Sequence, residues 1–104
     1  MEINEFAKMS RERSLKNDKN KVFDWEYYII ATGGEAGELL NLLKKMKRGD
    51  FPFDKDKIAD EAADIFTYSL LILAALGVDP EEAIMKKYSE VDRRLEAGGW
   101  HKRV

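Results

Sequence analysis

The chain has 104 residues, the length of one domain, and leaves no room for a second. Charged residues make up 37% of it, but 18 basic against 20 acidic side chains leave a net charge of only −2. We therefore expect a single domain over residues 1–104 with no general attraction to nucleic acid or to a membrane, and the lack of cysteine excludes disulfides and thiolate metal sites.

The first predicted element is a short amphipathic helix from Ile3 to about Ser14, where apolar residues recur at helical spacing. The opening segment, Met1 to Ser10, is polar and lacks the apolar run of a secretory signal, so we expect a cytoplasmic protein. A polar stretch from Leu15 to Lys21 follows as a loop.

A second and longest helix is predicted from near Phe23 to Arg48, because helical spacing of apolar residues persists until Gly49. Three glycines lie inside it, and each lowers helix stability by up to ~1 kcal/mol relative to alanine. Two of them, Gly33 and Gly37, lie opposite the face that carries the glutamates of this helix. They either let a second helix approach closely or mark a local kink.

A third helix is predicted from about Lys55 to Leu76, with an aspartate near its start and Gly77 as its C-terminal stop. After Ile65 it is apolar around most of its circumference, as expected for a helix surrounded by partners. Its apolar run is shorter than the ~20 residues of a bilayer span, so we interpret it as a core helix.

A fourth helix begins with favourable local chemistry, since Asp79 can cap it, Pro80 suits its first position and Glu82 completes a capping box. It is predicted to run to about Ala97, before a tail whose histidine, His101, is not expected to be buried. No segment alternates polar and apolar residues as a strand does, so the predicted fold class is all-α. We expect a four-helix bundle completed by homo-oligomerisation, as a dimer or tetramer.

Two pairs of carboxylates are the most informative feature: Glu35 and Glu38 on the second helix, and Glu61 and Asp64 on the third. Each pair is spaced three residues apart and so points along one helix face. Each face is otherwise apolar, so both pairs are predicted to point inward. Buried carboxylates need a cation, and a site built from oxygen ligands alone favours Mg²⁺, with Mn²⁺ as a substitute.

This arrangement resembles the all-α nucleoside triphosphate pyrophosphohydrolases of the MazG-like and dCTP pyrophosphatase type. That family carries two glutamates three apart in a Gly-rich helix, then an E-x-x-D pair on the next helix. The matching positions here are Glu35, Glu38, Glu61 and Asp64. Tyr68 stands one turn further on, as in the dCTP pyrophosphatase branch, and Gly34 also matches that branch, whereas many MazG-like proteins have a glutamate there. The resemblance covers about Ala31 to Arg94.

The resemblance implies a MazG-like bundle that hydrolyses a (deoxy)nucleoside triphosphate to the monophosphate and pyrophosphate, with Mg²⁺, for cleansing or control of the nucleotide pool. Carboxylates suit this reaction on chemical grounds, because they can hold the ion and accept a proton from water. All four acids are therefore expected metal ligands and expected catalytic residues. Which of them is the general base is left open, as is the preferred nucleotide.

Seven further residues are candidates for binding the substrate: Trp25, Tyr28, Lys45, Arg48, Tyr68, Lys87 and Arg94. The three aromatic residues offer stacking surfaces for a base, although aromatic residues at helical spacing also serve as core. The two basic residues of the second helix suit a triphosphate tail or the helix dipole. The two on the last helix match the family pattern K-x-x-x-N-x-x-R, with Val91 in place of the asparagine, which changes the polar contact expected there.

Several competing interpretations are open. The enzyme could be of the related phosphoribosyl-ATP pyrophosphohydrolase type, or the chain could be a catalytically silent helical module for oligomerisation or partner binding. The acids could also be ordinary exposed carboxylates paired with Lys44, Lys45 or Lys57. A di-iron bundle is excluded, because it requires Glu-x-x-His motifs, and no basic stripe with interleaved aromatics predicts nucleic-acid binding.

Overall fold

The computed structural model describes residues 1–98, and this range contains four α-helices and no strand. The helices are α1 (Ile3–Lys16), α2 (Trp25–Arg48), α3 (Lys55–Ala75) and α4 (Pro80–Glu96). The predicted all-α class with four helices is confirmed, and His101 lies outside the described residues. None of these helices taken singly is both long enough and apolar enough to cross a membrane.

Local chemistry sets the helix ends. Asp24, Asp54 and Asp79 precede α2, α3 and α4, and each side chain accepts a hydrogen bond from a backbone amide of the first turn. Gly49 ends α2 in the left-handed conformation, with φ of 82°, which a residue with a Cβ adopts only with strain. The predicted helix ends differ from the observed ones by at most two residues.

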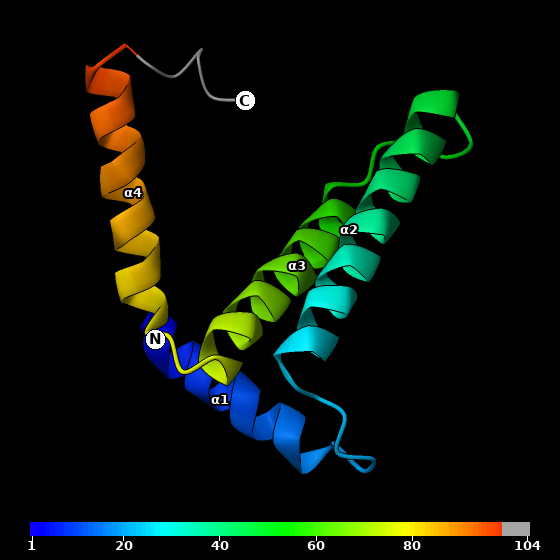
Figure 1. Cartoon of the computed structure of the whole chain (residues 1–104). Coiled ribbons are helices and arrows are strands. Elements are labelled where there is room, and N and C mark those ends of the chain that lie inside the picture. The colour runs from blue at the N-terminus through cyan, green and yellow to red at the C-terminus, as the bar shows by residue number, and fades with distance from the viewer. Residues whose placement is uncertain (99–104) are drawn as a thin grey trace.

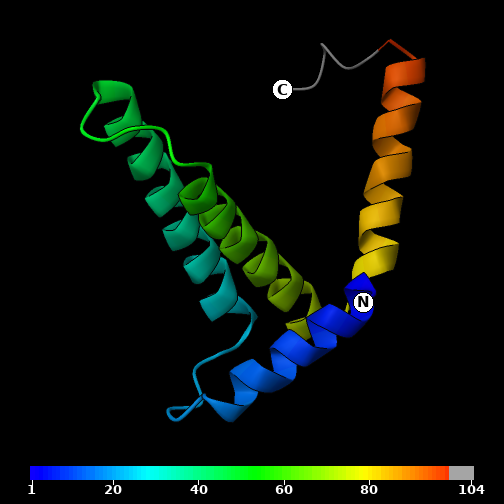
Figure 2. The same cartoon turned by 180° about the vertical axis from the view of Figure 1, so that it is seen from behind.

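The helices form an open, V-shaped molecule (Figures 1 and 2). α2 and α3 lie side by side as an antiparallel hairpin, and α1 crosses the C-terminal part of α3 at the base of the V. α4 leaves the end of α3 after a bend of 109°. Within residues 1–98, α4 contacts α1 and α3 but not α2.

The hydrophobic core of this single chain is small. The buried apolar residues among those described are Ala7, Tyr28, Leu70 and Leu71. The hydroxyl of Tyr28 accepts a hydrogen bond from Arg11 Nη1 at 2.7 Å and shares another with Ser14 Oγ at 2.6 Å. Arg11 also donates to the carbonyl of Phe23, so side-chain hydrogen bonds link α1 to the start of α2.

Large apolar side chains remain exposed on α2 and α4. Ile30 and Leu40 on α2 are 73% and 68% exposed, and Met85 and Tyr88 on α4 are 53% and 65% exposed. The accessible surface is 8056 Å², against about 6000 Å² for a compact monomer of 12.0 kDa. The radius of gyration is 16.7 Å, where a compact chain of this length has about 13 Å. One chain alone therefore leaves an unusually large apolar surface in contact with water.

Candidate metal and nucleotide site

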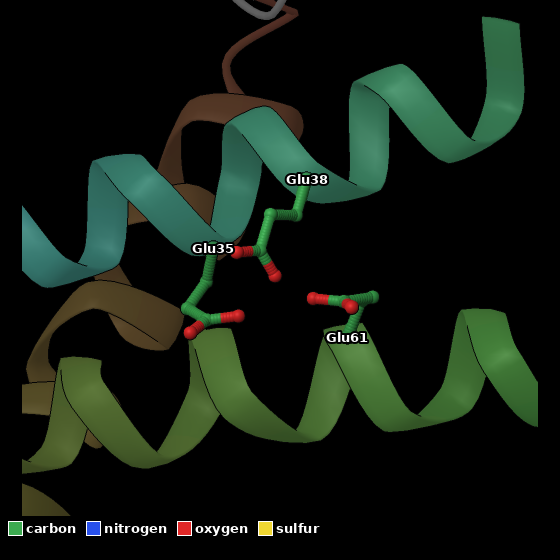
Figure 3. A group of neighbouring side chains, drawn as sticks. All are labelled: Glu35, Glu38 and Glu61. Carbon is green, nitrogen blue, oxygen red and sulfur yellow. The ribbon is translucent and has the colours of Figure 1, made fainter.

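The helical hairpin brings three carboxylates together. Glu35 and Glu38 of α2 and Glu61 of α3 each offer an oxygen, and these oxygens lie within 4.8 Å of one another. Figure 3 shows the three side chains pointing toward each other across the space between the two helices. The spacing of three in α2 places its two glutamates on the side that meets α3. The structure thus assembles three of the four predicted acids in one place.

Burial makes this cluster different from a set of surface acids. Glu35 and Glu61 are partly buried, while Glu38 is more exposed. The Oε2 atom of Glu61 is buried and has no hydrogen-bond partner within the described residues. A buried carboxylate oxygen without a partner is costly, because it has lost its water shell and gained nothing in return. The cluster therefore favours an added cation or a proton.

The raised pKa of Glu35 also indicates that negative charge is disfavoured in this cluster. Burial, followed by a hydrogen bond with Glu61 that its protonated form can make, raises the pKa of Glu35 from 4.5 to about 7. The negative charges of the nearby Glu38 and Asp64 are smaller causes of the same rise in pKa. Near neutral pH, protonated and ionised forms of Glu35 are thus both present, and a divalent cation would take the place of the proton.

Asp64 lies one turn beyond Glu61 and is set apart from the other three acids. Its side chain is exposed and lines a cavity of about 270 Å³ between α1 and α3. It is not one of the three residues whose oxygens converge within 4.8 Å. Its charge still acts on Glu35, so it borders the cluster. The prediction that both acid pairs point inward thus describes Glu35 and Glu61 better than Glu38 and Asp64.

Among residues 1–98, no basic side chain forms an ion pair with the four candidate acids. Within residues 1–98, the ion pairs are Arg48 with Asp50, and Lys87 and Arg94 with Glu90. None of the four candidate acids takes part. The interpretation of these acids as ordinary carboxylates paired with Lys44, Lys45 or Lys57 therefore finds no support in the side-chain contacts.

The predicted aromatic residues occupy three different environments. Tyr68 is partly buried and lines the cavity that Asp64 lines. Burial, with the neighbouring Tyr27 and the charges of the acids as smaller causes, raises the pKa of Tyr68. Tyr28 lies in the core, 1% exposed, with its ring centroid 6.4 Å from that of Tyr68, so the two rings are neighbours. Trp25, in the first turn of α2, is 43% exposed.

The predicted basic residues also separate. Lys45 is partly buried and lines a second cavity, of about 460 Å³, together with Glu38 and Glu61. Arg48 is exposed and bonded to Asp50 at 2.6 Å. Lys87 and Arg94 lie on α4, which does not contact α2, and both are paired with Glu90. Of the four, only Lys45 is next to the acids in this chain.

Sequence reasoning missed several residues that line the two cavities. Asn41 lines the larger one, as does Lys57, which was considered only as an ion-pair partner of the acids. Arg13 of α1 and Asn17, the residue after α1, line the smaller one. Lys57 had a sequence signal, because it precedes Glu61 by four residues and so shares its helix face. Arg13 and Asn17 had none, because the face of α1 that meets α3 is decided by tertiary packing.

No family model, curated protein or solved structure matches this chain.

Proposed function

We propose that the protein is a Mg²⁺-dependent nucleoside triphosphate pyrophosphohydrolase that acts on (deoxy)nucleotides in the cytoplasm, of the MazG-like type that the sequence resembles. The observation that carries the proposal is the convergence of Glu35, Glu38 and Glu61, with a buried Glu61 oxygen that has no hydrogen-bond partner among residues 1–98. A silent helical module has no need of such a cluster, which lowers stability unless a cation or a proton occupies it.

The donor set fits the ion. Three carboxylates supply hard oxygen ligands, and the described residues place no sulfur or imidazole beside them. Glu35, Glu38 and Glu61 would hold Mg²⁺ or Mn²⁺, and Asp64 borders them. When bound, the ion supplies charge neutralisation for the phosphate oxygens.

The reaction is a hydrolysis between the α and β phosphates. A water oxygen forms a bond to the α phosphorus, and the bond from that phosphorus to the bridging oxygen breaks. The bridging oxygen leaves with its electron pair as part of pyrophosphate. The proton of the water passes to a carboxylate and then to solvent, and Asp64, exposed at the edge of the cluster, is suited to receive it.

A coupled assay for pyrophosphate over the common and modified nucleoside triphosphates, with Mg²⁺ or Mn²⁺, tests the proposal. We expect release of pyrophosphate by the native protein and a loss of at least about a hundredfold in Glu38→Gln, the scale expected when an ion or its positioning is lost. Glu12→Gln, which changes an exposed acid of α1 away from the cluster, is the matched control. If no nucleotide yields pyrophosphate and Glu38→Gln binds metal as the native protein does, the proposal is wrong.

The proposal includes a homo-oligomer. The accessible surface exceeds that of a compact monomer by about 2000 Å². This excess is in the range that each subunit of an obligate dimer typically buries in its interface. The exposed apolar residues of α2 and α4 supply the chemistry for such an interface. Within one chain α4, which carries Lys87 and Arg94, does not contact α2. These two residues could therefore reach a carboxylate cluster only in another subunit.

A further inference from the structure

Two cavities flank the carboxylates on opposite sides along α3. The lysine cavity, about 460 Å³, is lined by Asn41, Lys45 and Lys57 together with the carboxylates of Glu38, Asp60 and Glu61. The tyrosine cavity, about 270 Å³, is lined by Arg13, Asn17 and Tyr68 together with Asp64. Glu61 borders one cavity and Asp64, one helical turn further along α3, borders the other, so the acids lie between the two cavities.

The lysine cavity has the chemistry of a phosphate site. Neither Lys45 nor Lys57 forms an ion pair with another described residue. The Nζ atom of the exposed Lys57 lies 5.4 Å from the ring centroid of Phe51, which also lines this cavity, so the ammonium group is near an aromatic face. Two ammonium groups and the amide of Asn41 offer donors to anionic oxygens.

The lysines next to Lys45 in the sequence differ from it in position. Lys44 and Lys47 are exposed and do not line the cavity, whereas Lys45, between them on the helix, is partly buried beside Glu38 and Glu61. A basic last turn that only complemented the helix dipole would have no reason to turn one lysine toward the acids. Lys45 is therefore distinguished by its position and not by its charge.

The tyrosine cavity has the chemistry of a nucleoside site. Tyr68 offers a ring whose centroid lies 6.4 Å from that of Tyr28, and Leu71 adds an apolar surface. Asn17 uses its Nδ2 to bond the carbonyl of Arg13, which leaves its Oδ1 as an acceptor for a base or sugar. Arg13 is the one cationic side chain among the residues that line this cavity, whereas the other cavity offers two lysines to a polyphosphate whose Mg²⁺ would offset its carboxylates.

We propose that the nucleotide binds in one direction across the cluster, with its β and γ phosphates in the lysine cavity and its nucleoside in the tyrosine cavity. This inference rests on the proposed function. The bond between the α and β phosphates then lies at Glu35, Glu38 and Glu61. Pyrophosphate forms beside Lys45 and Lys57, and the monophosphate forms beside Tyr68.

Calorimetric titration with the two products tests this direction without any turnover. The probes are inorganic pyrophosphate and each of the four common deoxynucleoside monophosphates, all with Mg²⁺. We expect Lys45→Met and Lys57→Met each to weaken pyrophosphate binding by about tenfold, the effect of one lost charge-assisted contact, and to leave monophosphate binding unchanged. Tyr68→Ala should do the reverse. Lys44→Met and Lys47→Met, which remove the same charge outside the cavity, should change neither.

The outcomes separate the two proposals. A native protein that binds pyrophosphate in a Lys45-dependent way but hydrolyses no triphosphate leaves the direction standing and removes the proposed activity. A protein that releases pyrophosphate, but whose Lys45→Met and Lys57→Met variants bind pyrophosphate as well as the native chain, overturns the direction. Failure of the native protein to bind either product, or equal losses for both products in every variant, also overturns it.

Discussion

At the scale of single residues, the interpretation of the site depends on one atom. The Oε2 oxygen of Glu61 is buried without a hydrogen-bond partner, although water could satisfy it if the side chain pointed outward. Native proteins tolerate few such atoms, and those that persist usually serve a ligand or a reaction. The neighbouring Glu35, whose pKa is raised to about 7, shows that the same place also disfavours charge on a second acid. Together these two acids indicate a position prepared for positive charge.

Metal binding should divide the four acids into two groups. Mg²⁺ at a hundred times its dissociation constant should stabilise the native protein by about 2.7 kcal/mol, seen as a rise in Tm. Glu61→Gln should abolish this rise, because it replaces one oxygen ligand in the converging group by an NH₂ donor. Asp64→Asn should keep most of it, since Asp64 lies outside that group. Equal loss of the rise in the two variants would show that Asp64 is a ligand after all.

The raised pKa of Glu35 predicts a pH dependence of stability in metal-free buffer. Between about pH 4.5 and 7 the folded chain keeps a proton on Glu35 that the unfolded chain has released. Stability therefore falls as pH rises through this window and stays lowered above it. Glu35→Gln cannot ionise, so its Tm should change less over the same range, whereas Glu12→Gln should follow the native curve. Thermal scans with a chelator present measure this, and a native-like slope in Glu35→Gln would contradict it.

At the scale of elements, the sequence predicted the helices well because their ends are encoded locally. Asp54 and Asp79 accept hydrogen bonds from the amides that follow them, and Gly49 adopts a conformation that suits glycine. These interactions join residues that are close together in the sequence, so the helix ends can be predicted from the sequence alone. The same holds for the pairing of Glu35 with Glu38, which the period of the helix dictates.

The parts that could not be predicted depend on how the helices pack. Helical periodicity placed Asp64 on the same face as Glu61, but the structure leaves it exposed, because α1 covers α3 further along and opens a cavity there. Tyr28 was a candidate for stacking on a base, and its position in the core follows from hydrogen bonds with Arg11 and Ser14. Neither the exposure of Asp64 nor the burial of Tyr28 can be predicted from the spacing of residues along the helices.

The start of α4 should be sensitive to one side chain that also ties it to α1. Asp79 accepts from the amide of Glu82 at 2.9 Å and from Asn4 Nδ2 at 3.0 Å, and these bonds lower the pKa of Asp79 from its ordinary value of 3.8. Asp79→Ala should lower Tm by roughly 5 °C near neutral pH.

The difference between native protein and Asp79→Ala should shrink as pH falls below 3.8, because a lowered pKa gives stability that is lost only when the carboxylate is protonated. Asp79→Asn is the matched control, since asparagine caps a helix without a charge. It should retain most of the stability at neutral pH and lose less of it in acid. A pH-independent difference for Asp79→Ala would show that the cap does not depend on the ionised form.

At the scale of the whole molecule, the open shape is the feature that one chain does not explain. The hairpin of α2 and α3 and the separate α4 leave the inside and the outside of the V facing water (Figure 1). A marginally stable domain of this size needs most of its apolar surface for its own core. The glycines of α2 fit the same picture, because a Cβ added at Gly33 or Gly37 would meet no atom within 4 Å in this chain. Helix stability is reduced there with no compensating contact inside the subunit.

A second copy on this face of α2 would supply the missing contact. Ile30, Gly33, Gly37 and Leu40 follow one another along the helix on the side opposite Glu35, and we call this stripe the glycine ridge. Because glycine lets two helix backbones approach closely, each alanine placed on the ridge would stabilise a lone helix by up to ~1 kcal/mol but would separate two packed helices. The two effects have opposite signs, so the ridge can be tested by substitution.

Sedimentation at micromolar concentration should show an oligomer for the native protein. Ile30→Glu and Leu40→Glu should convert it to a smaller species, because each places a charge in the interface. Leu15→Glu, at an α1 position that is 49% exposed, should leave the oligomer intact. Gly33→Ala should weaken association, whereas Gly34→Ala, which lies off the ridge on the same helix, should leave it nearly unchanged. A native protein that sediments as a monomer, or that becomes more stable in Gly33→Ala with no change in association, would mean that the ridge faces solvent and that the glycines have another cause.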